Sequence, residues 1–336
     1  MSTVGIDLFS DIRLVEMINV ACVGAGYWCK NLIRNFDSIG ALHTICDGVT
    51  EVIDEFQNKY PKANVESDYS AVLSNTAVDA VSIATPAETH YELIKSALIA
   101  GKHVYVEKPL CLNEDHAAEC IEIADQENLT LMVGHLLWYH PMVLEIKRQI
   151  DQGELGQLRY LYSNRLNMGL LRSEENVLWS FAPHDISMIL GLIGSEPESV
   201  KAHSANHLNP QIADNAVGLL KFDGGVSAHI FVSWLNPFKE QKLVVIGDKA
   251  QLVFDDTQTW EKKLAKYHHA VEWDGKRPLA VKSEADYIVL PESEPLRDEC
   301  LHFLKSVETG EPPRTDGREG LRVLKVLNKL QHAMDA

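Results

Sequence analysis

The sequence has little that suits a membrane or a nucleic acid. No run approaches the roughly 20 uncharged apolar residues of a membrane-spanning helix. The first residues carry acids instead of the basic apolar stretch of a signal peptide. A net charge of −17 disfavours a phosphate backbone and an anionic lipid surface as partners. We therefore expect a cytoplasmic protein without nucleic-acid or membrane partners.

Cysteine is also sparse, and its spacing excludes two further classes. The six cysteines stand at positions 22, 29, 46, 111, 120 and 300. They show neither the pairing of a metal site nor a disulfide framework. No zinc-type cluster is present, and no serine or cysteine nucleophile has supporting neighbours. The cysteines are expected to be small buried side chains in a reducing compartment, with no metal bound.

Strands and helices alternate strictly in the first part of the chain. Strand-like runs cover 18–23, 43–46, 80–84, 103–107 and 130–133, and helix-like runs cover 30–37, 50–59, 90–100 and 114–128. The last helix is expected to begin after Asn113 as N-cap. Such alternation predicts an α/β domain with a doubly wound parallel sheet over residues 1–137, of which 1–16 form an appended segment before the first strand.

The pattern changes near residue 137. A helix over 142–152 is followed by runs of alternating polarity at 158–167, 216–222, 225–234, 241–247, 251–254 and 286–290. Alternation with tight turns predicts an α+β domain at 138–336, with a mostly antiparallel sheet open on one face. Two amphipathic helices within 294–336 are expected to pack back on the first domain. The open face suggests a homodimer or homotetramer formed through this sheet.

The richest motif lies where the first strand ends. The apolar run from Ile18 to Val23 leads into Gly24-Ala25-Gly26 and then into a helix. Paired glycines let the backbone approach a pyrophosphate, while the next helix points its positive end at that charge. Cys29 stands where a third glycine is commonest, and it is small enough for close helix packing. A glycine turn without nucleotide stays the alternative interpretation.

An acidic residue follows this turn at the spacing of a dinucleotide site. The second strand ends at Asp47, which lies 47 − 26 = 21 residues beyond Gly26. A carboxylate there accepts hydrogen bonds from the adenosine ribose and repels a 2′-phosphate. The pattern favours NAD over NADP.

Two further strand ends carry candidate cofactor-binding residues. Glu107-Lys108-Pro109 follows the fourth strand, so Lys108 is expected near the nicotinamide as a proton carrier or alkoxide donor. Thr85-Pro86 follows the third strand, and Thr89 is expected to cap the helix that begins with His90. His90 is expected to be a helix-terminus residue and not a catalyst.

The second domain contributes the other candidates. A helix is expected to begin near Pro183, with His184 and Asp185 on its first turn, where the helix dipole lowers the pKa of a histidine. Arg165 and Asn167 end the first strand of this domain, and Arg172 and Asn176 follow before the helix. These side chains could grip a diphosphate or sugar hydroxyls, or form surface ion pairs only.

Together these motifs resemble the glucose–fructose oxidoreductase and inositol dehydrogenase family (Gfo/Idh/MocA) from residue 18 to 336. The resemblance rests on the turn Gly24-Ala25-Gly26-Tyr27-Trp28, on Thr85-Pro86 with His90, on Glu107-Lys108-Pro109, on Gly153-x-x-Gly156 leading to Arg165, on His184, on Gly310-x-x-Pro313 and on Gly317-x-x-Gly320. It implies an N-terminal Rossmann domain and an NAD-dependent dehydrogenase in which Lys108 and His184 flank the reacting carbinol. Many members carry acids where this chain has Ser180 and Ser187, and Asp185 is expected to take over part of their role.

The resemblance further implies a small-molecule substrate. Arg165-Leu166-Asn167, Asn176 with Trp179, and the run from Ser180 to Asp185 are most similar to dehydrogenases that oxidise C3 of UDP-linked amino sugars. One alternative is a dehydrogenase or reductase of a free sugar or cyclitol. An alternative of another class is a dinucleotide-binding sensor without turnover.

Overall fold

The computed structural model describes residues 18–169 and 171–335, and the chain divides into two units. The first unit holds the described residues up to Glu107, together with Glu122–Met132 and Cys300–Pro313. The second holds Lys108–Ile121, Val133–Glu299 and the chain from Arg314 onward. Each unit is described by itself below.

The first sheet has six strands in the order β3-β2-β1-β4-β5-β6. They are β1 (Val20–Val23), β2 (Leu42–Cys46), β3 (Asn64–Glu66), β4 (Ala80–Ile83), β5 (His103–Glu107) and β6 (Leu131–Gly134). The neighbours from β3 to β5 pair in parallel. This order is that of a Rossmann fold, with a switch point between β1 and β4. The doubly wound parallel sheet is confirmed, and β3 is an additional short strand.

Helices connect these strands. They are α1 (Cys29–Ile39), α2 (Thr50–Lys59), α3 (Tyr69–Ser74), α4 (His90–Ile99) and α5 (Glu114–Glu127). Strands β1 and β4 are buried along their whole length, as continuous apolar runs in parallel sheets require. Asn113 caps α5 as predicted, because its Oδ1 accepts hydrogen bonds from the backbone N–H groups of Asp115 (2.8 Å) and His116 (3.1 Å).

The second sheet has eight strands in the order β16-β13-β12-β11-β7-β10-β9-β8. They are β7 (Leu158–Leu166), β8 (Ser199–Ala205), β9 (Asn215–Lys221), β10 (Ser227–Ser233), β11 (Glu240–Gly247), β12 (Gln251–Asp255), β13 (Leu264–Tyr267) and β16 (Asp286–Tyr287). Neighbouring strands of this sheet pair antiparallel, except β7 and β10, which pair in parallel. The mostly antiparallel α+β architecture is thus confirmed.

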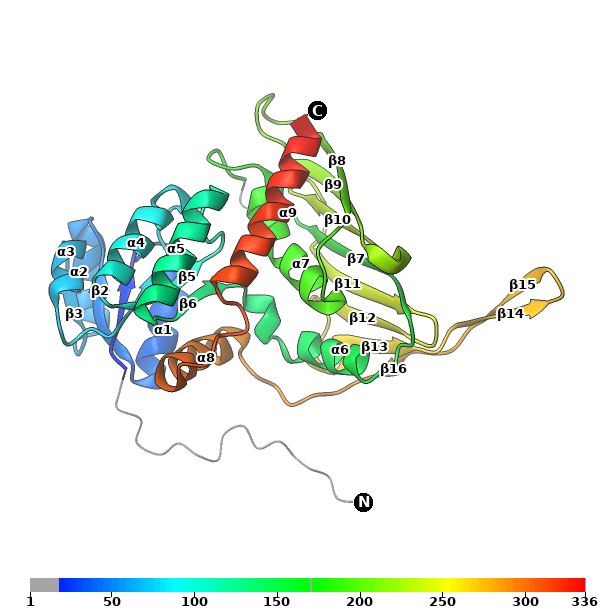
Figure 1. The fold of residues 1–336 in the computed structure, drawn as a ribbon, viewed down its shortest axis with the longest axis horizontal. Helices are drawn as coiled ribbons and strands as arrows, with labels where there is room; N and C mark the ends of the chain where they lie inside the picture. The colour runs from blue at the N-terminus through cyan, green and yellow to red at the C-terminus, as the bar shows by residue number, and fades with distance from the viewer. Residues whose placement is uncertain (1–17, 170, 336) are drawn as a thin grey trace, which may run out of the picture. The chain divides into compact units, whose positions relative to one another are not determined.

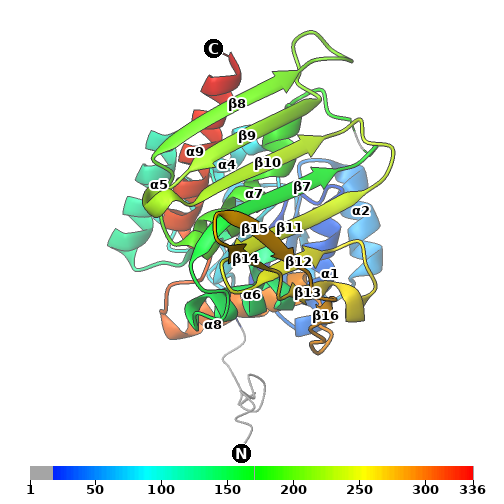
Figure 2. The same ribbon diagram turned by 90° about the vertical axis from the view of Figure 1, so that its right-hand side faces the viewer.

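The helices of this sheet lie on one of its faces. Helix α7 (Val177–Ile193) packs on β7 and β10, and α9 (Gly317–Asp335) packs on α7 and β8 (Figures 1 and 2). Helix α6 (Pro141–Asp151) contacts α7 and β12. The opposite face exposes apolar side chains, of which Leu219 is 52% exposed. Helix α8 (Pro295–Thr309) enters the first unit at Cys300, where Phe303 packs edge-on against Tyr105.

A two-stranded hairpin projects from the second sheet and was not predicted. Strands β14 (Ala270–Asp274) and β15 (Arg277–Val281) pair only with each other and are exposed throughout (Figure 1). All six cysteines are buried and unbridged, as expected. Within the described ranges, no helix is long and apolar enough to cross a membrane.

Candidate functional site

The glycine turn after β1 has the shape that a pyrophosphate requires. Gly24 has a φ of 85°, and a Cβ there would lie 2.6 Å from Cγ2 of Thr85. A Cβ on Gly26 would meet no described atom within 4 Å, so open space faces this residue. Gly24 is therefore required by the fold, whereas the space at Gly26 is a cradle that a Cβ would fill. The turn fits a bound dinucleotide.

Residues at the ends of β2 and β5 border this turn. Asp47 follows β2, and its Oδ1 accepts a hydrogen bond from the N–H of Val49 at 2.9 Å. Indole Nε1 of Trp28 donates to Oε1 of Glu107 at 2.5 Å, which joins the start of α1 to the end of β5. Tyr27 is 86% exposed beside them. These side chains gather at the carboxyl ends of parallel strands, where ligands of such sheets bind.

The segment after β4 differs in one detail from the prediction. His90 begins α4 as expected, and Nε2 of its buried ring donates a hydrogen bond to the carbonyl oxygen of Thr85 (3.0 Å). The prediction that Thr89 caps this helix was wrong, because its side chain makes no hydrogen bond to the first turn of α4. Its Oγ1 instead bonds Thr85 Oγ1 and the carbonyl of Pro86, both at 2.7 Å, because a short 3₁₀ turn precedes α4. The threonine thus fixes the Thr85-Pro86 loop.

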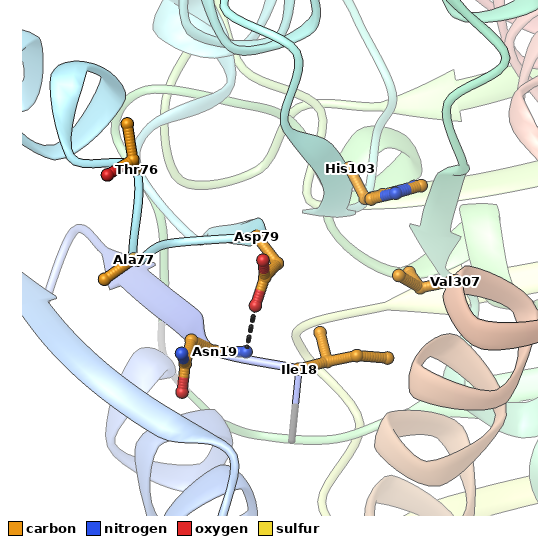
Figure 3. Close-up of a pocket in the computed structure, with 7 residues that line it drawn as sticks. All are labelled: Ile18, Asn19, Thr76, Ala77, Asp79, His103 and Val307. Carbon is orange, nitrogen blue, oxygen red and sulfur yellow. Dashed lines mark hydrogen bonds between the residues drawn. The ribbon is translucent and has the colours of Figure 1, made fainter. Parts of the chain in front are cut away.

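A hollow of about 410 Å³ in the same unit is not this site. Figure 3 shows it lined by Ile18 and Asn19 before β1, Asp79 before β4, and His103 at the start of β5, with Thr76, Ala77 and Val307. Asp79 accepts the N–H of Asn19 there at 2.8 Å. These residues precede the strands, whereas the glycine turn, Thr85 and Glu107 follow them. The hollow therefore lies at the amino ends of the strands.

In the second unit, Lys108 contacts the stretch of α7 that carries His184. The ammonium of Lys108 donates to the carbonyl oxygen of Ser180 at 3.0 Å. Residues four apart lie on one face of a helix, so Ser180 and His184 share a face of α7. An ammonium and an imidazole thus lie beside one helical turn.

The prediction that α7 begins at Pro183 was wrong. The helix begins at Val177, where Oδ1 of Asn176 accepts the N–H groups of Leu178 and Trp179 at 3.0 and 3.3 Å. Pro183 lies inside the helix, and His184 is therefore not on its first turn. The helix dipole acts within the first turn, so it does not account for the electrostatics of His184.

The pKa of His184 is nevertheless held well below its usual value of 6.5. Burial is the main cause, and the positive charges of Arg165 and Lys108 and the neighbouring His135 add to it. Its Nδ1 is buried and has no hydrogen-bond partner among the residues that the structure describes. A neutral imidazole of this kind can accept a proton from a hydroxyl.

Asp185 is paired, not free to approach a ligand. It is fully buried, and it binds Nε of Arg165 at 2.9 Å and Nη2 at 3.1 Å, while Ser163 donates to it at 2.6 Å. Removing one member of such a buried pair is costly because it leaves the other charge uncompensated. The carboxylate locks Arg165 into a fixed position next to His184.

The remaining predicted substrate residues are tied to different partners. Nδ2 of Asn176 and Nε1 of Trp179 both donate to Oε1 of Gln331 on α9, at 2.8 and 3.1 Å. The side chain of Arg172 is 45% exposed and reaches Glu175 only at 3.7 Å. The N–H of Asn167 donates to the carbonyl of Ser233. Of this group, Arg172 keeps the most accessible charge.

Sequence reasoning missed a carboxylate that reaches this region from α9. Glu319 binds Nδ1 of His135 with one oxygen and Oγ of Ser187 with the other, each at 2.5 Å. The ring of His135 lies edge-on to that of His184, with centroids 6.5 Å apart. The one signal in the sequence was the pair Gly317 and Gly320. A Cβ on Gly320 would lie 2.7 Å from Val133, so this glycine lets α9 pack closely against β6. Among the described residues, no group of acids, histidines and cysteines could hold a metal ion.

A Rossmann sheet whose glycine turn fits a dinucleotide is typical of the NAD-binding domain of an oxidoreductase. Residues 18–135 match the model of an oxidoreductase family with an NAD-binding Rossmann fold, and 143–253 match the C-terminal domain of the same family. The chain belongs to the Gfo/Idh/MocA family.

Named relatives span most of the chain. It is 29% identical over 262 residues to UDP-N-acetylglucosamine 3-dehydrogenase of Acidithiobacillus ferrooxidans, covering 77% of this chain and 80% of that protein. It is 25% identical over 254 residues to scyllo-inositol 2-dehydrogenase (NAD(+)) of Bacillus subtilis, covering 70% and 73%. A solved structure of the Acidithiobacillus enzyme superposes with a TM-score of 0.81 at 26% identity, covering 94% of this chain and 97% of that one.

Proposed function

We propose that this chain oxidises a secondary hydroxyl of a sugar or cyclitol, specifically C3 of a UDP-linked amino sugar. One observation carries the reaction type: the Lys108 ammonium is bound to the carbonyl of Ser180, one helical turn before His184. A base on a helix and a cationic donor bound to the same helical turn suit removal of a hydroxyl proton and stabilisation of the resulting alkoxide. A sensor without turnover needs neither group.

The chemistry divides between the cofactor and these residues. NAD, held by the turn at Gly24 and Gly26 and by Asp47, supplies the hydride acceptor when it is bound. His184 takes the hydroxyl proton because burial and neighbouring cations keep its imidazole neutral. Lys108 donates a charge-assisted hydrogen bond to the developing alkoxide.

The choice of a nucleotide sugar has its own support. The Acidithiobacillus enzyme named above, similar to this chain in sequence and in solved structure, is a UDP-N-acetylglucosamine 3-dehydrogenase. Arg172 is half exposed and only weakly paired, so its guanidinium is the best placed to bind a diphosphate. The inositol dehydrogenase relative supports the free-cyclitol alternative.

Turnover of two variants tests the reaction type. His184→Asn and Lys108→Met should each lower kcat by about 10²–10⁴-fold, because general acid–base catalysis is worth that much. His332→Asn and Lys329→Met, exposed residues of α9, are matched controls that should leave turnover unchanged. NADH binding should persist in all four. Turnover within a few-fold of the parent in either site variant would refute the assignment.

A substrate panel tests the sugar. UDP-N-acetylglucosamine, its uronate, scyllo-inositol and free glucose are each offered with NAD, and NADH formation is followed by absorbance. We expect reduction with a UDP-sugar, and Arg172→Ala should raise its KM without changing that of inositol. Turnover of inositol alone, with no UDP-sugar bound at millimolar concentration, would favour the free-cyclitol alternative.

The open face of the eight-stranded sheet suggests a homodimer or homotetramer. Partly exposed Tyr162, His229 and Phe231 lie on adjacent strands there, with the rings of Tyr162 and His229 stacked at 5.1 Å. An apolar sheet face of this kind favours association. Phe231→Glu should reduce the mass measured by light scattering. An unchanged mass would place the interface elsewhere.

A further inference from the structure

The neutral state of His184 creates a difficulty for the proposed reaction. After His184 takes a proton it carries a positive charge, and the charged groups nearest to it include two cations, Arg165 and Lys108. Asp185 cannot compensate that charge alone, because Arg165 and Ser163 already occupy both of its oxygens. A proton outlet from this histidine would remove the difficulty.

His135 and Glu319 offer that outlet. His135 is 2% exposed and follows β6, and its ring lies edge-on to His184. Its Nδ1 is bound to the Glu319 carboxylate at 2.5 Å. A neutral histidine that donates Nδ1–H to a carboxylate leaves Nε2 as a proton acceptor, because the bond at one nitrogen sets the tautomer at the other.

Glu319 is itself held from two sides. One oxygen binds His135, and the other accepts Oγ of Ser187, which lies three residues after His184 on α7. The carboxylate therefore fixes His135 relative to the helix that carries the proposed base. Gly320 lets α9 approach the end of β6 closely enough for this contact.

We propose that Glu319 and His135 are positioning residues that relay the proton away from His184. This inference rests on the proposed function. The substrate O–H bond breaks as an N–H bond forms on one nitrogen of His184, while the N–H bond on the other nitrogen breaks. That second proton passes to Nε2 of His135, whose ring lies edge-on to that of His184. The hydride, with its electron pair, goes to NAD.

Charge explains why the relay is favourable. The proton ends on an imidazole that contacts a carboxylate, whereas on His184 it would sit near Lys108 and Arg165. The attraction between opposite charges in contact, 2.5 Å apart between His135 Nδ1 and Glu319 Oε2, favours a proton on His135. Glu319 thereby supplies a negative charge in contact with His135.

The first test needs no substrate. Nuclear magnetic resonance of isotopically labelled histidine nitrogens follows both rings across pH, with His135→Asn and His184→Asn to assign them. We expect neutral His135 to carry its proton on Nδ1, because that nitrogen contacts the Glu319 carboxylate. A proton on Nε2 instead overturns the relay.

The second test uses UDP-N-acetylglucosamine and scyllo-inositol as probes. A relay base must be unprotonated, so Glu319→Gln should move the acid limb of the kcat profile to lower pH and lower the plateau about 10–100-fold. KM should stay within a few-fold. Ser187→Ala removes one bond to Glu319 but keeps its charge, so the limb should not move. An equal loss at every pH in Glu319→Gln indicates a merely structural role and overturns the relay.

The two proposals fail in different ways. If His184→Asn keeps its turnover, the proposed function fails. If His184→Asn is inactive while Glu319→Gln and His135→Asn keep the parent profile, only the relay fails.

Discussion

Replacing the two glycines of the turn after β1 by alanine should separate folding from cofactor binding. Gly24 has a left-handed φ of 85°, which costs a residue with a Cβ about 1–2 kcal/mol. Its Cβ would also lie 2.6 Å from a methyl group of Thr85, and such overpacking costs about 1–3 kcal/mol. We expect Gly24→Ala to lose about 2–5 kcal/mol of unfolding free energy, and the unfolding midpoint to fall by roughly 5–15 °C.

Gly26 is the matched contrast. It is not among the glycines of positive φ, and a Cβ there meets nothing within 4 Å. The unfolding free energy of Gly26→Ala should therefore stay within about 0.5 kcal/mol of the parent. Its methyl group occupies the space that a pyrophosphate would approach, so at least one hydrogen bond to a charged group is lost, worth about 1.5–3 kcal/mol. The Kd for NADH should rise about 10–100-fold.

Differential scanning fluorimetry and calorimetric titration with NADH measure both effects. In Gly26→Ala the unfolding midpoint without ligand should match the parent, while the rise on adding NADH should shrink. Parent-like NADH affinity in Gly26→Ala would refute the assignment of this turn to the pyrophosphate. Parent-like stability in Gly24→Ala would refute the role given to its backbone conformation.

Three further changes test the cofactor choice, the electrostatics and the packing behind the site. Asp47→Ser should lower NADH affinity about tenfold, because a charged hydrogen bond to the ribose is lost, and should raise NADPH affinity, because the repulsion of its 2′-phosphate is lost. An unchanged preference for NADH in fluorescence titrations would show that other residues discriminate between the cofactors. The pKa of His184 is lower in the folded than in the unfolded protein, so below pH 6.5 the unfolded chain takes up the proton more readily and stability falls as pH falls. Thermal unfolding of His184→Asn should therefore show a smaller loss between pH 7 and pH 5 than the parent, and equal losses would contradict the burial of a neutral imidazole. Gly191→Ala gains about 1 kcal/mol of helix propensity but places a Cβ 1.9 Å from Cζ2 of Trp138, whose Nε1 is bound to Ser187 O at 3.1 Å. A net loss of about 1–3 kcal/mol is expected in denaturant unfolding, relieved by Trp138→Leu in the double variant; a more stable Gly191→Ala would show that the ring moves aside freely.

Local patterns account for what could be predicted of the fold. A few consecutive residues of the sequence are enough to predict the apolar strands β1 and β4 and the helix cap at Asn113. Buried parallel strands are continuous apolar runs, and a cap is a single residue. The hairpin β14–β15 was missed, since its strands bury none of their residues. The predicted start of helix α7 was too far along the chain, because proline is typical of a first helical turn and Pro183 was placed there. The helix begins earlier, after its N-cap Asn176.

The candidate site divides in the same way. Gly24, Asp47 and Lys108 follow strand ends, and parallel topology brings such ends to one edge of a sheet. The partners of the predicted side chains were not predictable. Arg165 was expected to hold substrate, but a buried carboxylate twenty residues along the chain binds its guanidinium.

The alternation of strands and helices in the first unit, the glycine turn and the acid 21 residues beyond Gly26 were decided by the sequence alone, since each depends on residues close together in the chain. Tertiary structure alone decided which acid binds His135. Glu319 and His135 are 184 residues apart, and their contact exists only because α9 packs against the end of β6. A bond between such distant residues leaves no periodicity in one sequence, so only the folded chain reveals it.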